Sequence, residues 1–172
     1  VGDASARVQP GGTIKPFVYA ALIEKTTNTG AGTKVDDTQG PLEGYPCTNR
    51  NQPSAGGNCL WNYDRVYAGS MSLRYALGTQ RNVPAVKAAL TVTLPVFSST
   101  VTAMGVEHGY DCYSDVAQKT ETLCYQASVL GDGAYLRFSD QTHAYATLSH
   151  NGNKQQQTVI LKTVLNGKVK SE

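Results

Sequence analysis

The stretch Gln9-Pro10-Gly11-Gly12-Thr13-Ile14-Lys15-Pro16-Phe17-Val18-Tyr19 is the most informative part of this chain. Apolar side chains recur from here at helical spacing, at Ile14, Phe17, Val18, Ala21 and Leu22. This period predicts a helix from about Thr13 to Lys25 with one buried face, and Pro16 falls in its first turn, where a missing N–H costs little. Position 12 precedes Lys15 by three residues and shares its helix face, but Gly12 has no side chain.

Composition limits the class of protein. The chain has 172 residues, and we expect a single domain over residues 1–172 with a substantial core. A formal net charge of +2, without a Lys/Arg cluster, argues against nucleic-acid binding. No stretch reaches the roughly 18 apolar residues of a membrane span, and no signal peptide opens the chain. Because Val1 is not an initiator methionine, we expect a processed product or a fragment of a longer protein.

The four cysteines form two pairs of equal spacing in polar, loop-like segments: Cys47, Cys59, Cys112 and Cys124. We expect two local disulfides, Cys47–Cys59 and Cys112–Cys124, with free buried thiols as the alternative. In the chain-entropy model each loop closure contributes about 3 kcal/mol. Disulfides imply an oxidising compartment, so we expect an extracytoplasmic protein, whether periplasmic, on the cell surface or secreted.

Metal and cofactor sites are not indicated. The cysteine spacing does not fit zinc, and no recognised ligand pattern is completed by His108, His143 and His150. No Gly-rich phosphate loop follows a predicted strand. We therefore expect no metal and no cofactor.

The remaining pattern is mainly helical. Residues 26–64 and 108–124 are rich in turn-forming residues and are expected to be irregular. Helices are predicted from about Ser70 to Gly78, from Asn82 as the cap with Pro84 early in the helix, from Ser98 to Met104, and from Ser139 or Asp140 to Ser149. A strand over Thr158–Val164, the turn Asn166-Gly167 and a return strand over Lys168–Lys170 predict a C-terminal β-hairpin.

Several phrases resemble class A penicillin-binding proteins in both wording and order. The first is Pro10-Gly11-Gly12-x-x-Lys15-Pro16-Phe17, where that family has Ser in place of Gly12. The others are Val35-Asp36-Asp37-Thr38, Asn62-Tyr63-Asp64, Leu73-Arg74-Tyr75-Ala76-Leu77, Arg81-Asn82-Val83-Pro84-Ala85-Val86-Lys87, and Ala144-Tyr145-Ala146-Thr147-Leu148 before Asn151-Gly152. The resemblance covers roughly residues 7–167 with gaps.

The resemblance implies a catalytic set that this chain retains only in part. The family carries Ser-x-x-Lys, Ser-x-Asn and Lys-Thr-Gly, and its serine attacks a D-Ala-D-Ala carbonyl or a β-lactam to form an acyl-enzyme. Here the two serine positions are Gly12 and Gln80. Lys162-Thr163-Val164 lacks the glycine of the third motif. Only Lys15 and Asn82 match the family's catalytic positions, so we expect an inactive transpeptidase-like protein.

Lys15 and Asn82 are the candidate ligand-binding residues, with a peptidoglycan stem peptide as the ligand that the resemblance implies. The alternative for Lys15 is a lysine kept by ancestry and hydrogen-bonded to backbone. The alternative for Asn82 is a helix cap, which we favour over substrate binding. Thr13 does not replace the missing serine, because it lies about 200° around the helix from Lys15.

The resemblance also implies a fold. It predicts the helical part of the penicillin-binding protein/β-lactamase-like fold, with a short C-terminal hairpin and with the central sheet largely missing. In the family the Ile14–Leu22 helix packs under that sheet. We therefore expect its apolar face to be covered by self-association or by a partner chain.

Three functions remain open from the sequence. The first is a catalytically inactive module that binds or scaffolds outside the cytoplasm. The second is a fragment of a bifunctional peptidoglycan synthase, and the third is a structural, self-assembling extracellular subunit. The sequence does not separate them.

Overall fold

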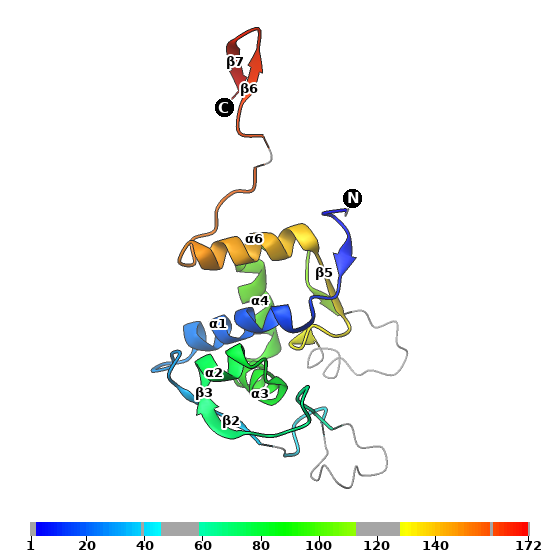
Figure 1. The fold of residues 1–172 in the computed structure, drawn as a ribbon, viewed down its shortest axis with the longest axis vertical. Coiled ribbons are helices and arrows are strands. Elements are labelled where there is room, and N and C mark those ends of the chain that lie inside the picture. The colour runs from blue at the N-terminus through cyan, green and yellow to red at the C-terminus, as the bar shows by residue number, and fades with distance from the viewer. Residues whose placement is uncertain (1–2, 39, 46–58, 113–127, 159, 172) are drawn as a thin grey trace.

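The computed structural model describes residues 3–38, 40–45, 59–112, 128–158 and 160–171, and within them the fold is mainly helical (Figure 1). The helices are the 3₁₀ helix η1 (Gly11–Ile14) and the α-helices α1 (Lys15–Lys25), α2 (Leu73–Gly78), α3 (Asn82–Val92), α4 (Leu94–Met104) and α6 (Phe138–Ser149). The strands are β1 (Arg7–Val8), β2 (Lys34–Asp37), β3 (Gly69–Ser72), β4 (Asp111–Cys112), β5 (Ala134–Arg137), β6 (Thr163–Leu165) and β7 (Lys168–Ser171). The predicted mainly α class is confirmed.

The strands form small antiparallel sheets. The largest among the described residues has the order β1-β5-β4, with Val8 opposite Leu136 and Asp111 opposite Tyr135. The pair β2–β3 runs from Lys34 opposite Ser72 to Asp37 opposite Gly69. Within the described parts of the chain, strands β6 and β7 pair with each other and with no other strand. The sequence did not predict β1, β2 and β5, because strands of two to four residues are too short to show a clear alternation.

Helix α1 is the centre of the core. It packs against α3 and α4, and α4 in turn packs against α6 (Figure 1). Ile14, Phe17, Val18 and Ala21 have no exposed surface. Burial of each large apolar side chain contributes about 1.5–3 kcal/mol relative to exposure.

The expectation that the Ile14–Leu22 face needs another chain is wrong. The face is covered by helices of the same chain, and even Leu22 keeps only 7% of its surface exposed. The Phe17 ring meets the Tyr145 ring of α6 edge-on, with 5.0 Å between the centroids. Self-association therefore gains no support from this face.

The predicted helices exist, but their starts shift. Helix α1 begins at Lys15 because residues 11–14 form η1. Helix α4 begins at Leu94 instead of Ser98, with a proline in its first turn, and it ends at the predicted Gly105, whose φ is 127°. The segment Gly69–Ser72 is a strand where a helix start was predicted. Ser72 is the cap of α2 and accepts a hydrogen bond from the Tyr75 N–H at 3.2 Å.

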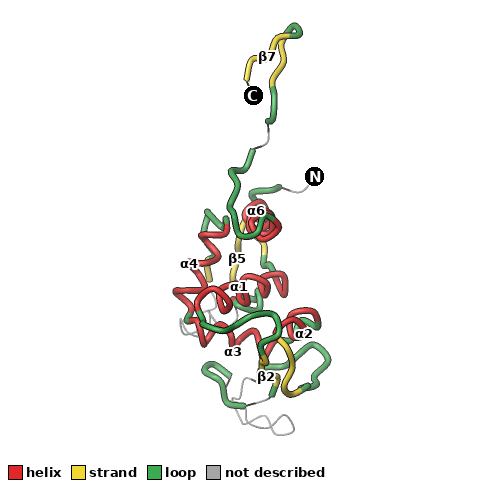
Figure 2. The backbone as a smooth tube through the Cα atoms, turned by 90° about the vertical axis from the view of Figure 1, so that its left-hand side faces the viewer, coloured by secondary structure: helices red, strands yellow, loops and turns green. Residues whose placement is uncertain are grey.

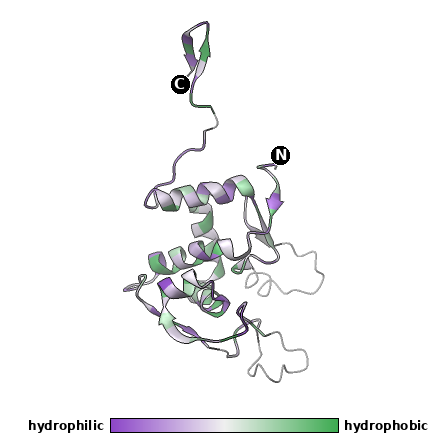
Figure 3. Ribbon diagram, viewed as in Figure 1, coloured by the Kyte–Doolittle hydropathy of each residue, from purple (hydrophilic) through white to green (hydrophobic). Residues whose placement is uncertain are grey.

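The C-terminal hairpin is confirmed, with a shorter first strand than predicted. Asn166 and Gly167 both have positive φ, 49° and 74°, as a tight hairpin turn requires. The hairpin extends away from the helices in both orientations (Figures 1 and 2). Its apolar side chains are exposed, and part of it is hydrophobic in Figure 3. The exposed apolar residues here are Ile160, Leu161, Val164, Leu165 and Val169.

Two further expectations concern covalent links and membranes. Cys47 and Cys124, one member of each expected disulfide, lie outside the described residues, so both pairings stay predictions. In the part of the chain that the structure describes, no single helix is long and apolar enough to cross a membrane. Helices α3 and α4 pass that test only as a pair, and they meet at 98°.

Candidate functional site

The site begins where η1 leads into α1. Gly11 has a φ of 56°, and its N–H donates to the Gly131 carbonyl at 3.1 Å. Gly131 also has positive φ, 74°, and a Cβ there would lie 2.0 Å from the Gly11 carbonyl oxygen. Only glycine at position 131 therefore allows the turn after residue 128 to press against the start of η1.

Lys15 lies one turn further, almost fully buried at 3% exposure. Its Nζ donates to the Gln80 backbone carbonyl and to Asn82 Oδ1, each at 2.6 Å. Both acceptors are neutral oxygens. Burial in these surroundings lowers the pKa of Lys15 to about 8, because desolvation penalises the charged amine.

Gly12 and Gln80 meet beside this amine. A Cβ built at Gly12 would lie 3.9 Å from Lys15 Nζ, which is where a side chain at this position would meet the amine. The same point is 2.6 Å from Gln80 Oε1, so the Gln80 carboxamide fills the space that a side chain at position 12 would need. The structure thus brings together Gly12, Lys15, Gln80 and Asn82, while their roles stay predictions.

Asn82 does not act as a helix cap, and the favoured interpretation of this residue is wrong. Arg81 is the N-cap of α3, and Asn82 is its first helical residue. The Asn82 side chain instead accepts from Lys15 and donates to the Trp61 carbonyl at 2.6 Å. It therefore connects the lysine to the loop that precedes α2. The hydrogen bond from Lys15 to the Gln80 backbone carbonyl agrees with the alternative of a lysine kept by ancestry and bonded to backbone. The second bond, to the Asn82 side chain, was not part of that alternative.

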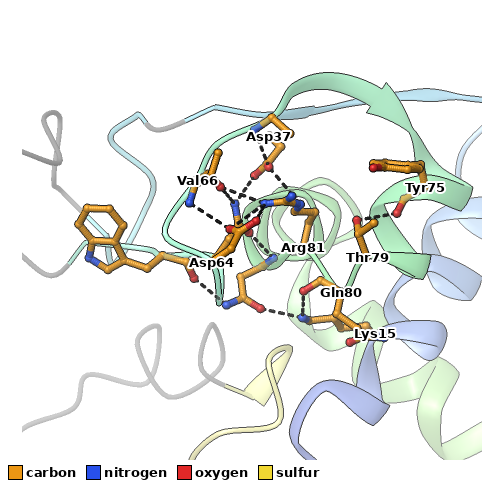
Figure 4. Close-up of polar contacts among 12 residues, drawn as sticks. Lys15, Asp37, Asp64, Val66, Tyr75, Thr79, Gln80 and Arg81 are labelled. Carbon is orange, nitrogen blue, oxygen red and sulfur yellow. Dashed lines mark hydrogen bonds and ion pairs between the residues drawn. The ribbon is translucent and has the colours of Figure 1, made fainter.

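A buried polar network lies next to the site (Figure 4). Asn62 is 3% exposed, donates to Asp37 Oδ1 and to the Val66 carbonyl, and accepts from the Asn82 N–H, all at 2.8 Å. Asp37 has no exposed surface and also accepts from the Ala68 N–H at 3.0 Å. The network joins β2, the 60–68 loop and the start of α3.

Arg81 closes this network on its solvent side. Its Nε lies 3.7 Å from Asp37 Oδ2, and its Nη1 lies 3.0 Å from Asp64. Sequence reasoning identified the segments with Asp37 and Asn62 as family phrases but gave them no role. Asp37 and Asn62 are 25 positions apart, so no local pattern indicated that they belong to one cluster. The only signal in the sequence was that both lie in phrases that resemble the family.

The other candidates from the sequence lie elsewhere. The Thr13 hydroxyl donates to the Pro10 carbonyl and accepts from Gln141, so it faces away from Lys15. Thr163 lies on β6 in the exposed hairpin, far from α1 in Figure 1. Beside Gln80 there is a small hollow of about 80 Å³. It is lined by Asn62, Tyr63, Asp64, Thr79, Gln80 and Arg81.

Comparison with known proteins identifies relatives. No family model matches the chain. It is 29% identical to penicillin-binding protein 1A of Streptococcus pneumoniae over 156 residues, which are 90% of this chain and 19% of that protein. The chain is related to the class A penicillin-binding proteins. Penicillin-binding protein 1A/1B of Bacillus subtilis is 33% identical over 82 residues, 48% of this chain and 8% of that protein. The chain thus spans 19% or less of the length of these relatives.

The fold agrees with this penicillin-binding protein relationship. The structure of the penicillin-binding protein PonA1 of Mycobacterium tuberculosis superposes on this chain with a TM-score of 0.72 at 19% sequence identity. The superposition covers 100% of this chain and 42% of the PonA1 chain. The predicted resemblance to part of the transpeptidase fold is confirmed. That Gly12 and Gln80 stand at the family's two serine positions stays a prediction from the resemblance, and Gln80 Oε1 lies 2.6 Å from where a Cβ at position 12 would be.

Proposed function

We propose that this chain is a transpeptidase-like module that binds or scaffolds outside the cytoplasm without forming an acyl-enzyme. The observation that carries the proposal is the Gln80 carboxamide, whose Oε1 lies 2.6 Å from where a Cβ at Gly12 would stand, beside Lys15. The relationship to penicillin-binding proteins supports a role in the bacterial cell wall. The four cysteines, if paired as predicted, support an oxidising compartment.

The chemical argument starts from what acylation requires. A serine at position 12 would give up its hydroxyl proton to the neighbouring amine and attack the carbonyl. Gly12 has no side-chain oxygen, and Lys15 Nζ donates to the Gln80 carbonyl and to the Asn82 amide oxygen, which have no proton to lose. Near the start of α1, the Thr13 hydroxyl is engaged with Pro10 and Gln141, and the Tyr145 hydroxyl donates to the Thr13 carbonyl at 2.7 Å. No covalent step is therefore assigned to this site.

A non-covalent role remains open to the same residues. Lys15 and Asn82 would provide a cation and an amide for the backbone and carboxylate groups of a peptidoglycan stem peptide. Asn82 is held in place from three sides, by Lys15, the Trp61 carbonyl and Asn62. Such prior positioning lowers the entropic cost of binding.

Intact mass spectrometry after incubation with penicillin V tests the proposal under non-reducing conditions. We expect no added mass, with a penicillin-binding protein treated in parallel as the positive control. A stoichiometric penicillin adduct on this chain would overturn it, because it would show a nucleophile that the geometry does not provide. The same spectrum reports both disulfides as a mass four hydrogens below the reduced chain.

Binding is tested separately with a synthetic stem pentapeptide ending in D-Ala-D-Ala, followed by two-dimensional NMR. Shifts confined to residues around Lys15 and Asn82, lost in Lys15→Met, would support the ligand-binding role. Shifts that persist unchanged in Lys15→Met would contradict it.

A further inference from the structure

The Gln80 side chain is placed differently from an ordinary surface glutamine. Its backbone has a left-handed φ of 56° at the short link between α2 and α3. Its own carbonyl accepts from Lys15 at 2.6 Å, and its N–H donates to the Leu77 carbonyl at 3.0 Å. The backbone of Gln80 is therefore fixed against both α1 and α2.

The carboxamide itself is held more weakly. Its Nε2 donates to the Leu77 carbonyl at 3.3 Å, which is at the long end of hydrogen-bond geometry, and the residue is exposed. Its Oε1 nevertheless lies 2.6 Å from the point where a Cβ at position 12 would stand, and Lys15 Nζ lies 3.9 Å from that same point. Because the Gln80 backbone is fixed and its side chain is loosely held, the carboxamide can rotate into solvent while the surrounding helices stay folded.

The tip of Gln80 lies where a side chain at position 12 would begin. Gly12 has an ordinary φ, unlike its neighbour Gly11, so the backbone at position 12 accepts a Cβ. Of the three atoms nearest to such a Cβ, Gln80 Oε1 is the one that lies closer than ordinary van der Waals contact, at 2.6 Å. Gln80 also lines the small hollow described above.

We propose that the Gln80 carboxamide is an internal cover of Lys15, standing where a ligand's amide carbonyl would bind, and that Lys15 becomes accessible when this side chain turns out. The inference deepens the proposed binding function by giving its site a gate. It also links the two departures from the family, Gly12 and Gln80. A side chain at position 12 would clash with Gln80 in its present position, so the two cannot occur together without a movement of Gln80.

Site-resolved acetylation of lysines measures the cover directly. The protein is treated briefly with N-hydroxysuccinimidyl acetate at pH 8.5, and the Lys15 rate is divided by that of Lys25, whose side chain is 44% exposed. Gln80→Gly removes the cover and suits the left-handed backbone. We expect the ratio to rise about tenfold, because the buried amine would no longer depend on opening of its cover.

Two further variants make the result specific. Gln80→Met keeps the length of the side chain and should leave the ratio close to wild type. Gly12→Ala places a Cβ 2.6 Å from Oε1 and should push the carboxamide out, raising the ratio without touching residue 80. Equal ratios in wild type, Gln80→Gly and Gly12→Ala would overturn the proposal.

The acetylation result is independent of the test of the proposed function. It needs no cell-wall ligand and no penicillin. A penicillin adduct would overturn the non-acylating function and leave the cover intact. Unchanged acetylation would overturn the cover and leave the non-acylating function intact.

Discussion

Replacing Asn62 by alanine tests whether one buried amide holds the 60–68 loop against β2 and the start of α3. The side chain is 3% exposed and makes three hydrogen bonds of 2.8 Å, to the Asp37 carboxylate, to the Val66 carbonyl and from the Asn82 N–H. Alanine removes all three partners and leaves the Asn82 N–H and one carboxylate oxygen less satisfied.

The magnitude follows from the kinds of bond lost. A hydrogen bond to a charged group contributes about 1.5–3 kcal/mol, and a neutral one about 0.5–1.5 kcal/mol. Two neutral bonds and one charged bond therefore predict a loss of about 2.5–6 kcal/mol in the free energy of unfolding. That is a large share of the roughly 5–15 kcal/mol of a typical domain.

Urea unfolding followed by tryptophan fluorescence measures this loss. Trp61 is the single tryptophan of the chain and is adjacent to Asn62, so it reports on the same loop. Asn153→Ala is the matched control, because Asn153 is exposed and its side chain donates to the His150 carbonyl, three residues away, at 3.2 Å. The control should stay within about 0.5 kcal/mol of wild type. If Asn62→Ala unfolds at the same urea concentration as Asn153→Ala, the reasoning about the network is wrong.

Three other outcomes follow from the same geometry. Because the folded pKa of Lys15 is about 8 and its ordinary value is 10.5, the unfolded chain binds more protons between these values. The free energy of unfolding, measured by urea titration, should therefore increase between pH 8 and pH 10.5 because of Lys15. This increase should be absent in Lys15→Met. Gly131→Ala should destabilise by about 3 kcal/mol or more, since its Cβ would strike Gly11, whereas Gly152→Ala, at equally positive φ but with open space, should cost about 1 kcal/mol. Deleting residues 159–172 should change the thermal midpoint by less than about 2 °C, because the hairpin buries little surface.

Each of these outcomes has a clear contrary. A Lys15→Met protein with the same pH profile as wild type would mean that the lysine does not titrate in this range. Equal losses for Gly131→Ala and Gly152→Ala would mean that the turn at Gly131 moves away from Gly11. A large drop in midpoint without residues 159–172 would place the hairpin against the helices in solution.

Much of the helical framework could be predicted from local pattern. The Ile14–Leu22 spacing, Gly105 as a helix end and Asn166-Gly167 as a hairpin turn depend on a few neighbouring residues, and the structure agrees with all three. The short strands could not be predicted, because their partners are distant in sequence. β1 exists only because Arg7 and Val8 meet Arg137 and Leu136, about 130 positions away.

The sequence alone was enough to place the chain beside a family and to show which hydroxyl groups are missing. Identity at single positions decides that question, since glycine and glutamine cannot do what serine does. Only the tertiary structure showed what replaces them. The contact of Gln80 with Gly12, the burial of Lys15 and the clamp on Asn82 by Asn62 join segments that the chain separates by 20 to 68 residues. Such contacts depend on how helices and loops pack, and no local pattern of residues specifies them.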